Sequence, residues 1–174
     1  MPALVVVARP DPIEGAAFRL FALWAGMIYV VVPFAYGVGL AVERDPWILY
    51  VLGVVWSGDT GAYFAGRAFG RHKLHPKVSP KKTVEGAIGG IVASVGGGYL
   101  LVVLLELPIA PWQALLFAAL GGALAQLGDL AESLVKRACG VKDSGTILPG
   151  HGGMLDRVDG VIFAFPFFAW ALSL

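Results

Sequence analysis

The sequence predicts an all-α, polytopic integral membrane protein with about five transmembrane helices. Of its 174 residues, 57% are hydrophobic and only 14% are charged, whereas an ordinary soluble domain carries about 25% charge. The apolar residues gather into runs close to the roughly 20 residues that a helix needs to cross a bilayer. We expect helices because an open sheet leaves backbone groups unsatisfied in lipid.

Five apolar runs carry this prediction, over residues 20–42, 47–66, 86–105, 107–128 and 160–174. The second run contains one charge, Asp59. The last has 15 residues and would reach only about 22 Å as a helix, so it either begins earlier or lies in locally thinned lipid. Pro33 and Pro166 predict kinks in the first and last spans.

The basic residues predict the orientation. If the N-terminus is cytoplasmic and there are five spans, twelve of the thirteen Lys and Arg residues lie on the cytoplasmic side and only Arg44 lies outside. The positive-inside rule therefore favours a cytoplasmic N-terminus. It also places the loop 67–85 and the segment 133–159 on one membrane face, where they can form one site.

The rest of the composition indicates one membrane-embedded domain over residues 1–174, without internal repeats. Among the 24 glycines, Gly86, Gly90 and Gly97 lie near one helical face, as close helix packing requires. A homodimer is an expectation from these glycine-rich faces. The single Cys139 excludes an internal disulfide.

Carboxylates within apolar runs are costly and indicate function. Asp59 lies deep in the second run, and Asp129 lies near the end of the fourth. Asp129, Ser133 and Lys136 follow at i, i+4 and i+7 and share one helical face. Such a face suits a cation that bridges the carboxylate to a phosphate, with the lysine on the phosphate charge. The simpler alternative is a helix end with a Glu132–Lys136 pair four residues apart, and it is favoured for the basic residues taken alone.

The segment 133–159 concentrates four basic residues, three aspartates and one histidine between two apolar runs. Asp156 and Asp159 stand three residues apart, so one helical turn would present both carboxylates, which suits Mg²⁺. His151 either contacts a phosphate or satisfies backbone groups of its glycine-rich turn. Zinc-ligand spacing and a Walker lysine motif are absent from the sequence.

The loop 67–85 is basic, and two interpretations stay open. It attracts anionic lipid headgroups, at about 1 kcal/mol per basic residue, or it receives an anionic lipid or a nucleotide. Ser79 or Thr83 is expected to cap the following helix, with Pro80 in its first turn.

These segments resemble the phosphatidate cytidylyltransferases, the CDP-diacylglycerol synthases. The resemblance lies in S-x-x-K-R, K-D, P-G-H-G-G and D-R-V-D within residues 133–159. D-T-G-A-Y-F-A-G-R at 59–67, S-P-K-K-T-V-E-G at 79–86 and Q-L-G-D-L at 126–130 resemble further family segments in the same order. The chain is similar to the C-terminal, catalytic part and lacks the additional N-terminal spans usual in that family. Whether it is a fragment, a minimal form or a decayed copy is left open.

The resemblance implies transfer of CMP from CTP to phosphatidate, giving CDP-diacylglycerol and pyrophosphate, with Mg²⁺ and a second cation. It implies catalytic roles for Asp129, Lys136 and Asp156. It implies metal ligation by Asp129 and Asp156, with Asp159 and Asp143 as second choices. Substrate binding is expected from seven further residues: Ser133, Arg137, Lys142, His151, Lys81, Lys82 and Asp59.

Partners and location follow from the same resemblance. CTP, phosphatidate and membrane lipid are the expected partners, and no nucleic acid is expected. The expected location is a bacterial inner membrane, with the active site on the cytoplasmic face. The alternatives are a CTP-dependent polyprenol or phytol kinase or an archaeal CDP-lipid synthase of the same superfamily, a transporter, and an inactive truncated subunit. A transporter would line a path to both faces, whereas here the charge gathers on one.

Overall fold

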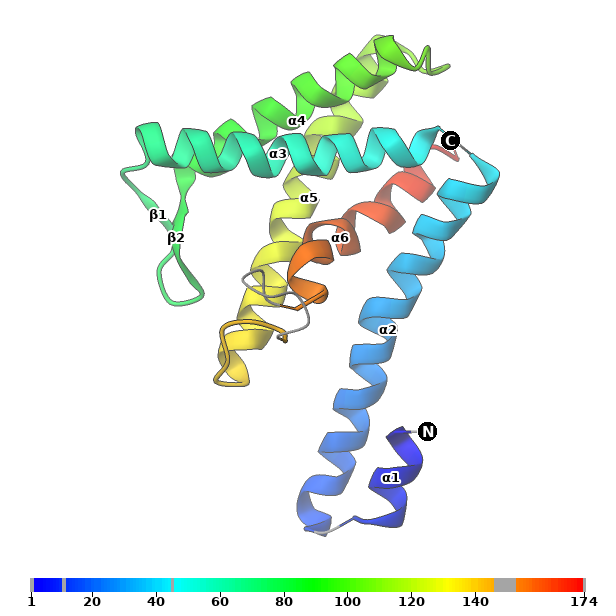
Figure 1. Cartoon of the computed structure of the whole chain (residues 1–174), viewed down its shortest axis with the longest axis vertical. Coiled ribbons are helices and arrows are strands. Elements are labelled where there is room, and N and C mark those ends of the chain that lie inside the picture. Colours follow the sequence, from blue (N-terminus) through cyan, green and yellow to red (C-terminus); the bar gives the residue numbers. More distant parts are fainter. Residues whose placement is uncertain (1, 11, 45, 146–152, 174) are drawn as a thin grey trace.

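The computed structural model describes residues 2–10, 12–44, 46–145 and 153–173. The described residues form the helices α1 (Pro2–Ala8), α2 (Ile13–Glu43), α3 (Trp47–Phe69), α4 (Val84–Leu104), α5 (Pro111–Ala138) and α6 (Leu155–Ala171), and the strands β1 (Lys73–His75) and β2 (Ser79–Thr83). Figure 1 shows α3 and α4 side by side across α5, with α6 between α5 and α2. The N-terminal part of α2, with α1 beside it, extends away from the other helices.

Each of the five predicted apolar runs forms a helix, but the prediction of an all-α chain was incomplete. The predicted loop 67–85 contains a two-stranded antiparallel sheet, β1–β2, with Lys73 opposite Thr83 and His75 opposite Ser79. The sequence also gave no indication of α1. Helix α6 begins at Leu155, five residues before the apolar run, because the helix includes the D-R-V-D segment.

Three described helices are long and apolar enough to cross a membrane by length and composition: Ile13–Val42 within α2, α4, and α5. The chain is therefore a mostly helical membrane protein. Helix α6 has 17 residues, about 26 Å at 1.5 Å per residue. The five-span arrangement and the cytoplasmic N-terminus stay predictions.

Small residues bring α3 and α4 into close contact, as the glycine pattern predicted. A Cβ atom added at Gly89 would collide with the Cβ of Ala65, and one added at Gly97 would lie 2.6 Å from the Cβ of Ser57. Gly86 and Gly90 are buried on the same side of α4. The glycine face is thus filled by contacts within one chain.

The base of the β1–β2 hairpin is fixed by contacts with the start of α4. Thr83 caps α4 by accepting a hydrogen bond from the Gly86 amide at 3.1 Å. The prediction that Thr83 or Ser79 caps this helix is therefore confirmed for Thr83. Pro80 instead lies in β2, not in the helix. The Glu85 carboxylate accepts a hydrogen bond from the Arg71 amide at 3.0 Å and contacts His72 Nδ1 at 2.6 Å.

A hydrophobic core joins α3, α5 and α6 on the side away from the hairpin. Tyr50 is fully buried and donates a hydrogen bond to the Ala114 carbonyl at 2.8 Å. Its ring packs edge-on against Phe168, with the centroids 5.5 Å apart. The α5 and α6 helices approach closely at Gly128, where an added Cβ would lie 2.7 Å from the Asp159 carbonyl. This packing holds the acidic first turns of α6 against α5.

Candidate active site

A cavity of about 410 Å³ lies between α3, the β1–β2 hairpin, α4 and α5 and has charged side chains among its lining residues. Four predicted site residues line it: Asp59, Lys81, Lys82 and Asp129. Strand β2 contributes both lysines to the lining, opposite residues of α3 and α5. Residues from three segments that the sequence analysis treated separately thus form one pocket.

An ion pair joins the hairpin to the membrane helix α5. Lys82 Nζ contacts Asp129 Oδ2. The Asp129 carboxylate also accepts a hydrogen bond from the Ser133 hydroxyl, with the oxygens 3.4 Å apart. Asp59 and Asp159 both interact electrostatically with Asp129. Three carboxylates from α3, α5 and α6 therefore share one neighbourhood with Lys82.

A second charged group lies further along α5, centred on Lys136. Its Nζ contacts Glu132 Oε2 and lies 2.5 Å from Asp156 Oδ1. The Glu132 side chain is only 1% exposed and that of Asp156 8%. The Glu132–Lys136 pair predicted as the simpler alternative is present, and Lys136 also reaches the start of α6. The two groups are neighbours, because Glu132 follows Asp129 by one turn on α5.

Asp156 holds the start of α6 to the end of the preceding described segment. Besides Lys136, it accepts hydrogen bonds from the Ser144 amide and hydroxyl at 2.8 and 2.7 Å and from the Gly153 amide at 2.8 Å. Burial raises the pKa of Asp156, but the hydrogen bonds from Lys136, Ser144 and Gly153 outweigh this effect and hold the pKa well below its usual range. The carboxylate is thus ionised and fully engaged with protein donors.

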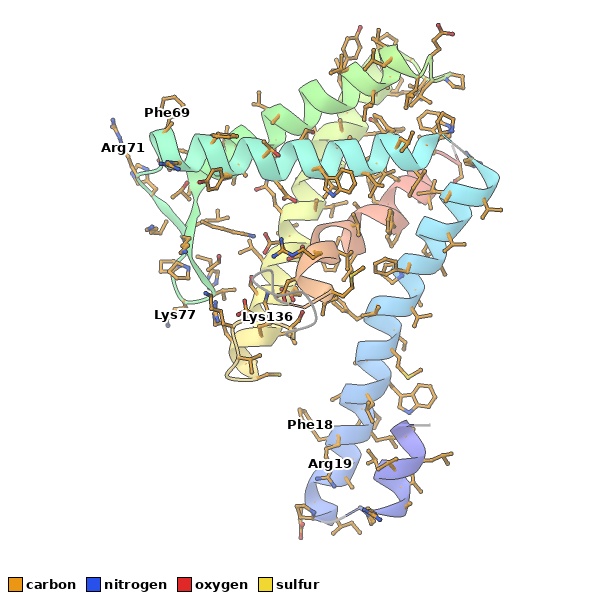
Figure 2. All side chains as sticks on the ribbon, viewed as in Figure 1. Phe18, Arg19, Phe69, Arg71, Lys77 and Lys136 are labelled. Atoms are coloured by element: carbon orange, nitrogen blue, oxygen red, sulfur yellow. The ribbon has the colours of Figure 1, made fainter. Side chains whose placement is uncertain are left out.

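Arg137 fixes the far end of the hairpin to α5. Its Nε donates to the Val78 carbonyl at 3.3 Å, and one terminal nitrogen donates to the Val141 carbonyl at 3.1 Å. In Figure 2, Lys77 lies at the hairpin turn and Lys136 near the end of α5, at the same side of the molecule. The loop 67–85 and the segment after α5 therefore meet, as predicted from the basic residues.

The remaining predicted residues lie outside both groups. Lys142 and Asp143 are exposed in the segment that follows α5. His151 lies outside the described residues, as do Pro149 and Gly150. Their predicted roles stay predictions.

The donor chemistry of the acidic groups suits Mg²⁺, which binds carboxylate oxygens. Asp129 fits this use because it lines an open cavity and has acidic neighbours. Among residues 2–10, 12–44, 46–145 and 153–173, however, no three His, Cys, Asp or Glu side chains converge closely enough to hold a metal ion. The predicted pairing of Asp129 with Asp156 on one metal therefore stays a prediction, and Asp156 is engaged with four donors here.

Three residues of the site were not singled out from the sequence. Tyr63 and Arg67 of α3 line the cavity, and Ser144 organises the start of α6. Tyr63 and Arg67 lie four residues apart, and their side chains are hydrogen-bonded at 3.1 Å. Their spacing from Asp59, at i+4 and i+8, places all three along one helical face. That spacing is the feature of the sequence that indicates Tyr63 and Arg67 as neighbours of Asp59.

Comparison with known proteins places the chain in a family. The model of the cytidylyltransferase family matches residues 3–174. The chain belongs to the cytidylyltransferase family. The match covers the cavity, both charged groups and α6.

Several bacterial relatives are named phosphatidate cytidylyltransferase. The protein of Staphylococcus saprophyticus is 45% identical over 151 residues, which is 87% of this chain and 56% of that protein. The Bacillus subtilis protein is 48% identical over 74% of this chain and 48% of its own length, and the Brucella suis protein 54% identical over 67% and 43%. The chain spans about half the length of the curated relatives it matches.

Proposed function

We propose that this chain transfers CMP from CTP to phosphatidate, giving CDP-diacylglycerol and pyrophosphate in phospholipid synthesis. The observation that carries the proposal is the cavity whose lining includes Asp59, Lys81, Lys82 and Asp129, beside helices apolar enough to cross a bilayer. The names of the relatives support it, because those proteins are 45% and 48% identical to this chain over the matched region.

The chemistry suits the residues present. A phosphatidate oxygen attacks the α-phosphorus of CTP, the bond to the bridging oxygen breaks, and pyrophosphate leaves. Such transfers depend on positioning and charge neutralisation more than on a covalent nucleophile. Lys81 and Lys82 on β2, with Arg67 on α3, place three cationic side chains around the cavity to hold triphosphate or the acceptor phosphate. A bound Mg²⁺ would supply further charge neutralisation at the phosphates.

The carboxylates have a separate role in the proposal. Asp129 is the principal ligand that we propose for Mg²⁺, with Asp159 beside it, and Asp59 supports the polar pocket. Asp156, the other predicted ligand, positions Lys136 and the Ser144 segment, and its contact with a metal is a further part of the proposal. Ser133 acts through Asp129, to which it donates a hydrogen bond. A second cation and contributions from Asp143, Lys142 and His151 remain part of the proposal.

The proposed location is a bacterial inner membrane, with five spans, a cytoplasmic N-terminus and the active site on the cytoplasmic face. Twelve of thirteen Lys and Arg residues then lie on that face. The contact between Arg137 and the hairpin supports one common face. A homodimer is a weaker part of the proposal, because the α4 glycines that suggested it pack within one chain.

The alternatives are less well supported. A CTP-dependent lipid kinase of the same superfamily would use a similar nucleotide pocket, but the relatives are named for cytidylyl transfer. An inactive truncated subunit would have no need of the Lys82–Asp129 pair within an open cavity.

The decisive experiment is an assay of the purified 174-residue chain in detergent with labelled CTP, phosphatidate and Mg²⁺. The proposal expects CDP-diacylglycerol and an equal amount of pyrophosphate, dependent on Mg²⁺. Asp129→Asn should abolish both products while leaving the melting temperature within a few degrees of wild type. A well-folded chain that yields neither product with any of several lipid acceptors would overturn the proposal.

A further inference from the structure

A second cavity, of about 370 Å³, lies between α2, α5 and α6 and is lined mainly by apolar side chains. Its walls include Tyr29, Val32 and Pro33 of α2, Leu124 of α5, and Phe163 and Pro166 of α6. Helices α2 and α5 are both apolar enough to cross a bilayer. The medium beside this cavity is therefore lipid.

Tyr29 marks the polar end of this apolar cavity. Its ring packs edge-on against Phe163, with the centroids 6.4 Å apart. Its hydroxyl is buried and, among the residues that the structure describes, has no hydrogen-bond partner. It interacts electrostatically with Glu132 and Asp159, which belong to the charged groups of the candidate active site. A buried hydroxyl without a partner is costly, so this one indicates a place for a polar group of a ligand.

Helix α6 carries both an acidic residue of the candidate active site and part of the lining of this cavity. On α6, Asp159 is followed by Phe163 after one turn and by Pro166 after seven residues, which is about 10 Å along the helix. Pro33 and Pro166, the two prolines inside the described helices, line the cavity. A proline removes one backbone hydrogen bond and pushes the helix away from ideal packing, which leaves room between α2 and α6.

We propose that this cavity binds one acyl chain of the acceptor phospholipid, with the Tyr29 hydroxyl donating a hydrogen bond to an ester carbonyl of that lipid. The arrangement places the ester end of the lipid at Tyr29 and its hydrocarbon between α2 and α6. It rests on the proposed function for the identity of the lipid as acceptor. It extends that function by naming the residues that select a long-chain substrate.

The test is photocrosslinking with a phosphatidate that carries a diazirine in one acyl chain, reconstituted with the full chain in phosphatidylcholine vesicles. The expected crosslinks fall on residues 28–33 and 162–166, and excess unlabelled phosphatidate, but not added phosphatidylcholine, should reduce them at least tenfold. Crosslinks that fall elsewhere, or that both lipids reduce equally, would overturn the proposal.

Matched variants separate the cavity from the general lipid surface. Val32→Trp, which fills the cavity, should lower the crosslinking about tenfold, whereas Val31→Trp should not, because Val31 is 58% exposed and does not line the cavity. Tyr29→Phe should raise the KM for phosphatidate about two- to tenfold and leave the KM for CTP unchanged. Equal effects of the two Trp variants would count against the cavity.

Crosslinking needs no turnover, so the two proposals fail in different ways. Specific crosslinking by a chain that makes no CDP-diacylglycerol would support the lipid cavity and overturn the proposed function. CMP transfer without specific crosslinking would support the proposed function and overturn the lipid cavity.

Discussion

Replacing Lys136 with methionine should destabilise the protein by about 3–4 kcal/mol, because Lys136 is the cation between two buried carboxylates. Glu132 is 1% exposed and Asp156 8% exposed. Removing one partner of a buried ion pair costs about 3–5 kcal/mol. Alternatively, the variant protonates Glu132 and so avoids the buried charge. At pH 7, protonating a carboxyl group with an ordinary pKa of about 4.3 costs about 3.7 kcal/mol, at 1.36 kcal/mol per pH unit, which is a similar figure. Asp156 loses less, because three other hydrogen bonds to it remain.

Thermal unfolding of the detergent-solubilised protein tests this prediction. For a chain of this size, 1 kcal/mol corresponds to about 2–4 °C, so Lys136→Met should melt about 10 °C below wild type. Adding Glu132→Gln to Lys136→Met should recover most of the loss, because it removes the uncompensated charge. Lys142→Met, which removes an exposed lysine from the adjoining segment, is the control. The reasoning is refuted if Lys136→Met melts with its control and the second substitution brings no recovery.

Three further predictions concern packing, the hairpin and acid stability. Gly89→Ala should lower the free energy of unfolding by about 1–3 kcal/mol in the same melting assay, because the added Cβ would collide with that of Ala65. Gly96→Ala should leave the melting temperature unchanged, because there is open space around Gly96. Equal melting temperatures for the two variants would contradict the α3–α4 packing. Arg137→Gln should speed hydrogen exchange in β2 without affecting α4, and unchanged exchange would show that Arg137 does not hold the hairpin. The pKa of Asp156 is lowered, so its contribution to stability is complete above its ordinary pKa of about 3.9 and is lost as pH falls through the folded-state pKa. In thermal melts between pH 5 and pH 2, Asp156→Asn should therefore lose less stability than wild type. An identical pH profile for the two proteins would contradict this contribution of Asp156.

The helices could be predicted because apolar run length decides them. Each apolar run became a helix, and the positions of Gly86, Gly90 and Gly97 indicated the α4 face that packs on α3. The β1–β2 hairpin could not be predicted in this way. Its strands are short and highly charged, and the hairpin is held by tertiary contacts such as that of Arg137, which is 59 residues from Val78 in the sequence.

The residues that form the site were predicted better than the contacts between them. Asp59, Lys82 and Asp129 do line one cavity. Helical spacing, however, placed Lys136 beside Asp129 on a common phosphate, whereas Lys136 pairs with Glu132 and reaches Asp156 of α6. Sequence spacing reports neighbours within one helix, and the approach of α6 to α5 depends on tertiary contacts such as that at Gly128.

The central claim is that the nucleotide binds in the cavity between the hairpin, α3 and α5, and equilibrium binding of labelled CTP to the purified chain with Mg²⁺ tests it most directly. Lys82 lines that cavity, whereas Lys77 is exposed at the hairpin turn and does not. A charge-assisted hydrogen bond contributes about 1.5–3 kcal/mol, so Lys82→Gln should raise the Kd for CTP at least tenfold and Lys77→Gln should leave it within twofold. Equal Kd values for the two variants would contradict the claim.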